Sequence, residues 1–143
     1  MQKHTVLRDV LAFGTDDAVA IAAPASKPMT FKRLRQQIEE TAQALSAFGA
    51  GSKDRVAIVL PNGPEMAAAF LSVASHAASA PLNPSYKAEE FEFYLSDLGA
   101  KLLIVEAGSA SPSIEVAKKL GVKIVSLTPD PDRGAGSFTL AGE

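Results

Sequence analysis

The sequence predicts an α/β fold in which helices flank a mainly parallel sheet. Three apolar runs, at residues 55–60, 101–105 and 122–127, show little polar alternation, which is typical of strands covered on both faces. Helical patterns separate these runs, and an alternating order of strand and helix favours right-handed crossovers and parallel pairing. The chain has 143 residues, which is enough for one domain with its own hydrophobic core.

The first predicted elements are a short helix and a hairpin. Gly14 ends the helix. The apolar face of this helix is expected to contain four residues: Val6, Val10, Leu11 and Phe13. Residues 19–23 and 29–31 form the two short strands of the hairpin. Pro24 and Pro28 shape the turn between them, because proline fixes φ and removes an amide donor.

An amphipathic helix is predicted next, from Phe31 to Phe48. Its larger apolar side chains recur at helical spacing: Phe31, Leu34, Ile38, Leu45 and Phe48. Thr30 is expected to cap the first turn, and Gly49 to follow the last turn in the left-handed conformation. Three basic residues fall on or near the other face: Lys32, Arg33 and Arg35. A solvated helix face is favoured there, and contact with a partner is the alternative.

The remaining helices lie between the apolar strands and after them. A helix rich in alanine and serine is predicted over about 64–78, and its small residues favour burial between neighbours. The loop 81–86 is rigid because it contains two prolines. Two further helices are predicted, one with Glu89 in its first turn and Gly99 at its end, and one over 113–120.

The periodic patterns stop near Thr128. Prolines and glycines punctuate a polar stretch from there to the last residue. We therefore predict an α/β subdomain over residues 1–127 and a flexible Pro/Gly-rich tail over residues 128–143.

Composition excludes several classes of protein. The chain has no cysteine, so disulfides, thiol nucleophiles and thiolate metal sites are excluded. Its two histidines, His4 and His76, lie too far apart in sequence to share a zinc-ligand spacing. The formal net charge of −2 argues against a nucleic-acid partner.

Targeting and membrane-spanning patterns do not occur in the sequence. Residues 1–10 lack the apolar core of a signal peptide, and the other apolar stretches are too short and too interrupted to span a bilayer. We therefore predict no membrane span and a cytoplasmic location, or a peroxisomal one if the source is eukaryotic.

Three short segments are candidates for a phosphate-binding loop. Residues 49–51 follow a helix and precede a strand, which is the wrong polarity, and a helix end explains them better. Residues 134–136 do not lie between a strand and a helix. The turn 61–64 has the right polarity, but its two prolines remove amides that would bind a phosphate, so ligand binding there is the lesser alternative.

Several polar side chains are candidates for catalytic groups. For His76, a packed ring bonded to a backbone carbonyl is favoured over a general base. For Glu89, Glu90 and Glu92, a solvated helix start is favoured over an acid–base pair. Tyr86 is expected to fill a gap in the core, with a substrate contact as the alternative. The residues themselves therefore assign no catalytic, cofactor-binding or metal-ligating position.

Five segments carry a family resemblance through their order and spacing: Met29-Thr30-Phe31, GAGSKDRVAIVLPNGPE at 49–65, APLNPSY at 80–86, the pair Glu89-Glu90, and LGAKLLI at 98–104. Together they resemble the N-terminal region of the adenylate-forming acyl-CoA synthetases, and the resemblance covers about residues 16–127. The run AEEFEFYLSD at 88–97 is most similar to the oxalate–CoA ligase branch. His76 departs from the pattern, since many relatives carry glycine at this position.

The resemblance implies a parent enzyme that joins a carboxylate to AMP, using ATP and Mg²⁺, and then transfers the acyl group to coenzyme A. The phosphate loop, the ribose-binding aspartate and the C-terminal domain of that family lie downstream of the matched region. The chain is therefore expected to be inactive alone, with no cofactor of its own. Its expected partners are the remainder of the parent ligase and, through exposed apolar surface, other copies of itself. A stand-alone, non-catalytic binding or assembly domain is the alternative, and an unrelated ligand-binding α/β domain is a third possibility.

Overall fold

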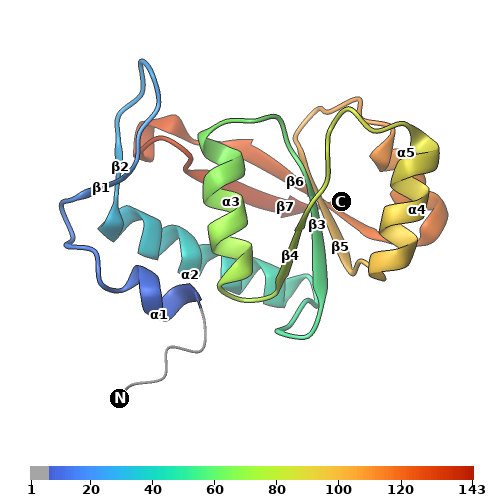
Figure 1. Cartoon of the computed structure of the whole chain (residues 1–143), viewed down its shortest axis with the longest axis horizontal. Coiled ribbons are helices and arrows are strands. Elements are labelled where there is room, and N and C mark those ends of the chain that lie inside the picture. The colour runs from blue at the N-terminus through green and yellow to red at the C-terminus, as the bar shows by residue number, and fades with distance from the viewer. Residues whose placement is uncertain (1–6) are drawn as a thin grey trace.

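The computed structural model describes residues 7–143 and contains a five-stranded sheet with helices on both faces (Figure 1). The strands lie in the order β4–β3–β5–β6–β7. Neighbours from β4 to β6 are parallel, and β7 at the edge is antiparallel to β6. This arrangement confirms the predicted, mainly parallel sheet. Its strands are β3 (Arg55–Val59), β4 (Ala78–Pro81), β5 (Leu102–Glu106), β6 (Lys123–Pro129) and β7 (Phe138–Gly142).

Alternate residues of each strand face opposite layers of helices. Val56 and Ile58 of β3 belong to the core cluster beneath α2 and α3. Ala57 and Val59 of the same strand belong to the cluster beneath α4 and α5. Both faces of the strand are therefore buried, which explains its uninterrupted apolar sequence. The helices of these two layers are α2 (Phe31–Ala47), α3 (Pro64–Ala74), α4 (Ala88–Leu98) and α5 (Ser113–Leu120).

The N-terminal segment contains α1 (Leu7–Leu11), β1 (Val19–Ile21) and β2 (Met29–Thr30). β1 and β2 are antiparallel, which confirms the hairpin. The expected apolar face of the first helix is wrong for Val10 and Phe13, which are 54% and 72% exposed. Only Leu11 of the expected set packs against the core among the described residues, because a five-residue helix is too short to lay a full stripe on it. Val6 lies outside the described residues.

The helix ends follow the sequence predictions. The Thr30 hydroxyl accepts a hydrogen bond from the Arg33 amide over 3.2 Å at the start of α2. Gly49 follows that helix with φ +90°, and Gly99 and Gly121 end α4 and α5 in the left-handed conformation. Every helix within residues 7–143 is too short or too polar to cross a membrane.

The segment after α3 differs from its prediction as helix and loop. The helix ends at Ala74, and residues 78–81 form β4 in parallel register with β3. The Ala78 amide donates to the carbonyl of Asp54 over 2.9 Å where this pairing begins. Alanine and serine have little strand preference of their own, so pairing with a neighbouring strand decides the conformation.

Residues 128–143 also differ from the predicted flexible tail. They contain the end of β6, a 3₁₀ turn at Pro131–Arg133 and β7, and residues 134–137 between the turn and β7 are buried, as is Phe138 at the start of β7. Gln37 of α2 bonds both backbone groups of Phe138. Its Oε1 accepts from the Phe138 amide over 3.0 Å, and its Nε2 donates to the Phe138 carbonyl over 3.1 Å. Contacts across 101 positions of sequence therefore order a stretch that has no periodic pattern.

A charged network joins α2 to this C-terminal segment. Arg33 is only 8% exposed, so the predicted solvated face is wrong for this residue. Its guanidinium donates to both carboxylate oxygens of Glu40, over 3.0 and 3.2 Å, and to the hydroxyl of Ser137 over 3.1 Å. Arg133 donates to the same carboxylate over 2.6 Å. Partial burial raises the pKa of Glu40, but the hydrogen bonds and charges of Arg33 and Arg133 outweigh it and hold this pKa below its ordinary value of 4.5.

This lowered pKa predicts a loss of stability in acid. A carboxyl group whose pKa is lower in the folded state stabilises the fold above its unfolded pKa, and this stabilisation is lost as the pH falls through the folded pKa. We expect Glu40→Gln to lose less stability than the unsubstituted chain between about pH 7 and about pH 3, measured as the urea midpoint. Glu115→Gln, at a side chain that is 80% exposed, is the control. Equal pH dependence in all three proteins would contradict the role of Glu40.

Candidate functional site

The carboxyl ends of β3 and β5 mark the place in the sheet where the chain connections diverge. β3 leads into α3, whose buried residues join the core cluster on one face of the sheet. β5 leads into α5, whose buried residues join the cluster on the other face. In open α/β sheets, ligands bind outside the carboxyl ends of strands at such a point. We therefore take this edge as the candidate site.

A hollow of about 420 Å³ opens at this edge. Three segments that are far apart in sequence line it, because parallel strands bring their carboxyl ends together. The lining residues that bear on its chemistry are Pro61 after β3, Pro84 after β4, and Glu106, Ser109 and Ser111 at and after β5.

The loop after β5 is held by its own hydroxyl groups. The Ser111 amide donates to the hydroxyl of Ser109 over 3.1 Å. The Ser111 hydroxyl lies 2.7 Å from that of Ser113 and accepts from the Ser113 amide over 3.2 Å, at the start of α5. Gly108 has φ +77°, which allows the chain to turn directly after the strand. The hydroxyls on this side of the hollow are therefore fixed in position.

The hollow combines a mainly apolar lining with hydroxyl groups and one acidic group. Glu106 is its charged residue, and Ser109 and Ser111 supply hydroxyls, while no lysine, arginine or histidine lines it among the described residues. A triphosphate is commonly held by cations and backbone amides, and the described lining supplies no side-chain cation for one. Within residues 7–143, no group of three or more acidic, histidine or cysteine side chains is placed to hold a metal ion. The site offers hydrogen bonding and shape, with no nucleophile–base pair.

The loop after β5 was not predicted as part of this site. Of the turn 61–64, only Pro61 lines the hollow, and Glu106, Ser109 and Ser111 contribute more polar groups. The position of Glu106, Ser109 and Ser111 in the sequence could have indicated this role. They directly follow the apolar run 101–105, and ligand-binding residues gather at the carboxyl ends of parallel strands.

His76 lies away from this edge and has the structural role that the sequence favoured. Its Nε2 is 3.1 Å from the carbonyl oxygen of Ala50 and 3.4 Å from the hydroxyl of Ser46. The hydroxyl of Ser75 donates to the carbonyl of Leu71, so it is not oriented toward the imidazole as a nucleophile. The ring therefore ties α3 to the segment that follows α2.

The acidic residues of α4 act at the helix start and on its surface. The Glu90 carboxylate accepts from the Lys87 amide over 2.8 Å, which caps the first turn. Glu92 forms an exposed ion pair with Lys119 of α5 over 2.9 Å. Tyr86 stacks on Tyr94 with their ring centroids 5.1 Å apart. The interaction with the hydroxyl of Tyr94 raises the pKa of Tyr86 above its ordinary value.

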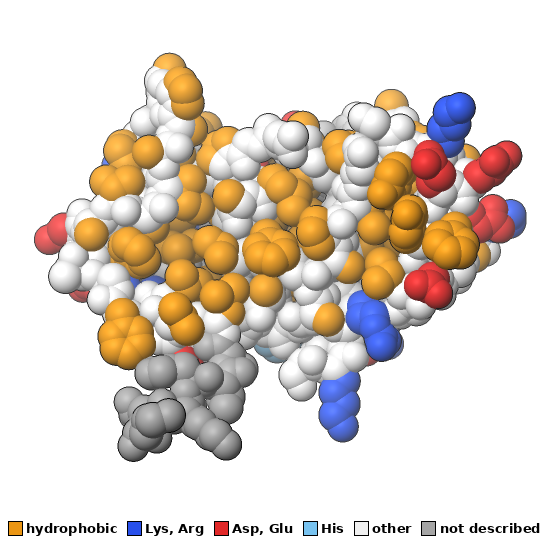
Figure 2. Space-filling view, in the orientation of Figure 1, with side chains coloured by type: hydrophobic (Ala, Val, Ile, Leu, Met, Phe, Trp, Pro, Cys, Tyr) orange, Lys and Arg blue, Asp and Glu red, His pale blue; other side chains and the backbone are white. Residues whose placement is uncertain are grey.

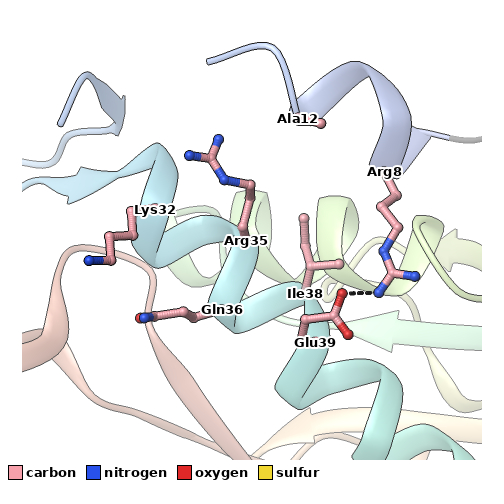
Figure 3. A pocket seen from close by; sticks show the side chains of 7 residues that line it. All are labelled: Arg8, Ala12, Lys32, Arg35, Gln36, Ile38 and Glu39. Atoms are coloured by element: carbon pink, nitrogen blue, oxygen red, sulfur yellow. Dashed lines mark hydrogen bonds and ion pairs between the residues drawn. The ribbon is translucent and has the colours of Figure 1, made fainter. Parts of the chain in front are cut away.

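A second hollow, of about 410 Å³, lies between α1 and α2 (Figure 3). Arg8 on α1 forms an ion pair with Glu39 on α2 across it. Arg35 pairs with Asp16 and donates to the carbonyl of Gly14 over 2.9 Å. These contacts attach the N-terminal segment to α2, so most of the charge around the hollow is already neutralised.

A family model described as AMP-binding enzyme matches residues 10–140. The chain belongs to the AMP-binding enzyme family. This membership confirms the resemblance to acyl-CoA synthetases that the sequence motifs carry.

Curated relatives of this chain include CoA ligases. It is 40% identical over 114 residues to an oxalate–CoA ligase of Arabidopsis thaliana, which covers 78% of the chain and 22% of the relative. It is 40% identical over 113 residues to a probable CoA ligase, CCL9, of Humulus lupulus, again covering 78% and 22%. The chain therefore spans about a fifth of the length of these relatives.

A solved structure supports the fold of this chain. The crystal structure of apo MatB from Rhodopseudomonas palustris superposes with a TM-score of 0.75 at 22% identity. The superposition covers 96% of this chain and 30% of that one. Nearly the whole chain therefore has the fold of one part of a larger protein.

Proposed function

We propose that this chain is the N-terminal subdomain of an ATP-dependent acyl-CoA ligase. In that reaction a carboxylate oxygen attacks the α-phosphorus of ATP and releases pyrophosphate, and the thiol of coenzyme A then attacks the acyl carbon and releases AMP. The observation that carries the proposal is 40% identity to CoA ligases over 78% of the chain, within a family match from residue 10 to residue 140.

The described residues support a scaffold role in this ligase. The hollow at the carboxyl ends of β3 and β5 contains no cation among its lining residues, and no metal-binding cluster occurs within residues 7–143. The groups that hold ATP and Mg²⁺ are therefore expected in other parts of the parent enzyme. Glu106 and the ordered loop at 107–112 contribute one polar wall of the site.

A chimera tests this function directly. The segment of the Arabidopsis oxalate–CoA ligase that matches this chain is replaced by residues 1–143, and oxalate-dependent AMP formation from ATP is measured with and without coenzyme A. We expect activity in the chimera and none in the chain alone or in the ligase that lacks the segment. The scaffold role would be contradicted by a folded chimera without activity, or by AMP formation with the chain alone. Calorimetric titration of the chain with ATP, AMP and coenzyme A gives a second readout, in which tight nucleotide binding would also contradict it.

A further inference from the structure

Helix α3 has an unusual composition for a helix at the surface. From Met66 to Ala74 it contains no charged residue, and Ser72 is its polar side chain in this stretch. A surface helix of a globular protein carries charged or polar residues on its outer face, whereas a helix that is apolar all round is buried on all sides. The composition of α3 therefore predicts that other elements cover its whole circumference.

The chain itself covers only one side of α3. Its buried residues lie together on the side that faces the sheet and α2: Ala68, Ala69, Ser72 and Val73. The opposite side, which we call the α3 outer face, consists of Ala67, Phe70 and the half-buried Ala74, and at its border Met66 packs partly against the core. Phe70 in its centre is 40% exposed, and Figure 2 shows apolar side chains gathered over this helix. An apolar helix face is thus left in water.

The exposed aromatic rings of α4 differ from this face. Phe93 is 64% exposed, but it shares its surface with Glu89, Glu92 and Asp97. Its ring also contacts that of Tyr94, edge to face, at 5.2 Å between centroids. Charged residues surround these rings, as in an ordinary amphipathic helix. On α3 the charged residue is Glu65 in the first turn, and the stretch from Met66 to Ala74 that carries the α3 outer face has none.

We propose that an apolar helix or strand from the rest of the parent ligase covers the α3 outer face. This inference rests on the proposed function. The chain spans 22% of its curated relatives and 30% of a solved structure with the same fold, so most of each such protein lies outside the matched region and is available to cover α3. Ala67 and Ala74 lie beside Phe70 and let a second backbone approach closely, while Phe70 supplies a large apolar anchor.

Thiol labelling tests which element covers this face. The chain has no cysteine, so a single substitution adds a unique label site. Ala67→Cys places the thiol on the α3 outer face, and Ser96→Cys places it beside Phe93 on α4 as a control. Both variants are made in the chain of 143 residues and in the natural ligase that contains this sequence. Alkylation rates at each site are read from the corresponding peptide by mass spectrometry.

We expect Ala67→Cys to react at least about tenfold more slowly in the natural ligase than in the chain, because a thiol in a packed interface is reached only through local opening. Ser96→Cys is expected to react equally in both. Equal rates for Ala67→Cys would overturn the inference and leave the proposed function standing. A natural protein that contains no ligase sequence beyond these residues would overturn both. The inference would also be overturned if Ala67→Cys became protected from alkylation in the chain itself as its concentration rises, and if the ligase gave no further protection. That result would assign the face to a second copy of the chain.

Discussion

Gly136→Ala is expected to destabilise the fold by about 2–4 kcal/mol, which is a large part of the stability of a small domain. Gly136 is buried with φ +87°, a conformation that residues with a Cβ adopt only with strain. A Cβ there would lie 2.6 Å from the carbonyl oxygen of Pro64 and 3.2 Å from the Cβ of Ala68. Because Pro64 begins α3, the clash would separate the C-terminal segment from that helix.

The control for this prediction is a glycine with the same backbone strain and free space around it. Gly49 has φ +90°, and a Cβ built on it meets no atom within 4 Å. Gly49→Ala is therefore expected to cost about 1 kcal/mol, which is the backbone contribution alone. Urea unfolding followed by circular dichroism measures both variants. If the two substitutions cost the same free energy, the close approach to Pro64 does not constrain the fold.

Gln37→Leu is expected to cost about 2–4 kcal/mol, because it leaves several buried polar groups without partners. The Gln37 side chain is 1% exposed and bonds both backbone groups of Phe138. Its Oε1 also accepts from the guanidinium of Arg33 over 2.8 Å. Leucine has a similar size and fills the space, so the loss reports on hydrogen bonding and not on a cavity.

Gln36 is the matched control because it directly precedes Gln37 on the same helix and its side chain is exposed. Gln36→Leu is expected to change the free energy of unfolding by less than about 0.5 kcal/mol. Hydrogen exchange at the amide of Phe138 should become faster in Gln37→Leu and stay unchanged in Gln36→Leu. Unchanged protection of that amide in Gln37→Leu would mean that another group satisfies it.

The two large predictions concern the same piece of structure, the joining of residues 134–138 to α2 and α3. This segment has no apolar periodicity, and its two glycines resemble those of a linker. Its order comes from buried partners that are distant in sequence. Gln37 and Arg33 provide hydrogen bonds, and the carbonyl of Pro64 provides a close contact that only glycine tolerates.

Local sequence patterns also did not predict most of the residues that line the candidate site. The sequence predicted the turn after the first buried strand as the lesser ligand-binding alternative, and the structure places Pro61 of that turn at the hollow. The site is completed by Pro84 and by residues 106–111, which come from the ends of other strands. Which strand ends meet depends on the order β4–β3–β5, and that order follows from crossover connections on opposite faces of the sheet.

The sequence by itself determined the elements whose evidence is local. The apolar strands at 55–60, 101–105 and 122–127, the cap at Thr30, and the helix ends at Gly49 and Gly99 depend on residues within a few positions of one another. The family motifs likewise lie in continuous segments, so the sequence alone carries the resemblance.

Only the tertiary structure decided the elements that have no strong preference of their own. The run at 78–81 is a strand because β3 offers it hydrogen-bond partners, and β7 is a strand because β6 and Gln37 do. The burial of Arg33 against Glu40 and Ser137 follows for the same reason. In each case the stabilising groups are far away in sequence, and only the folded chain brings them within bonding distance.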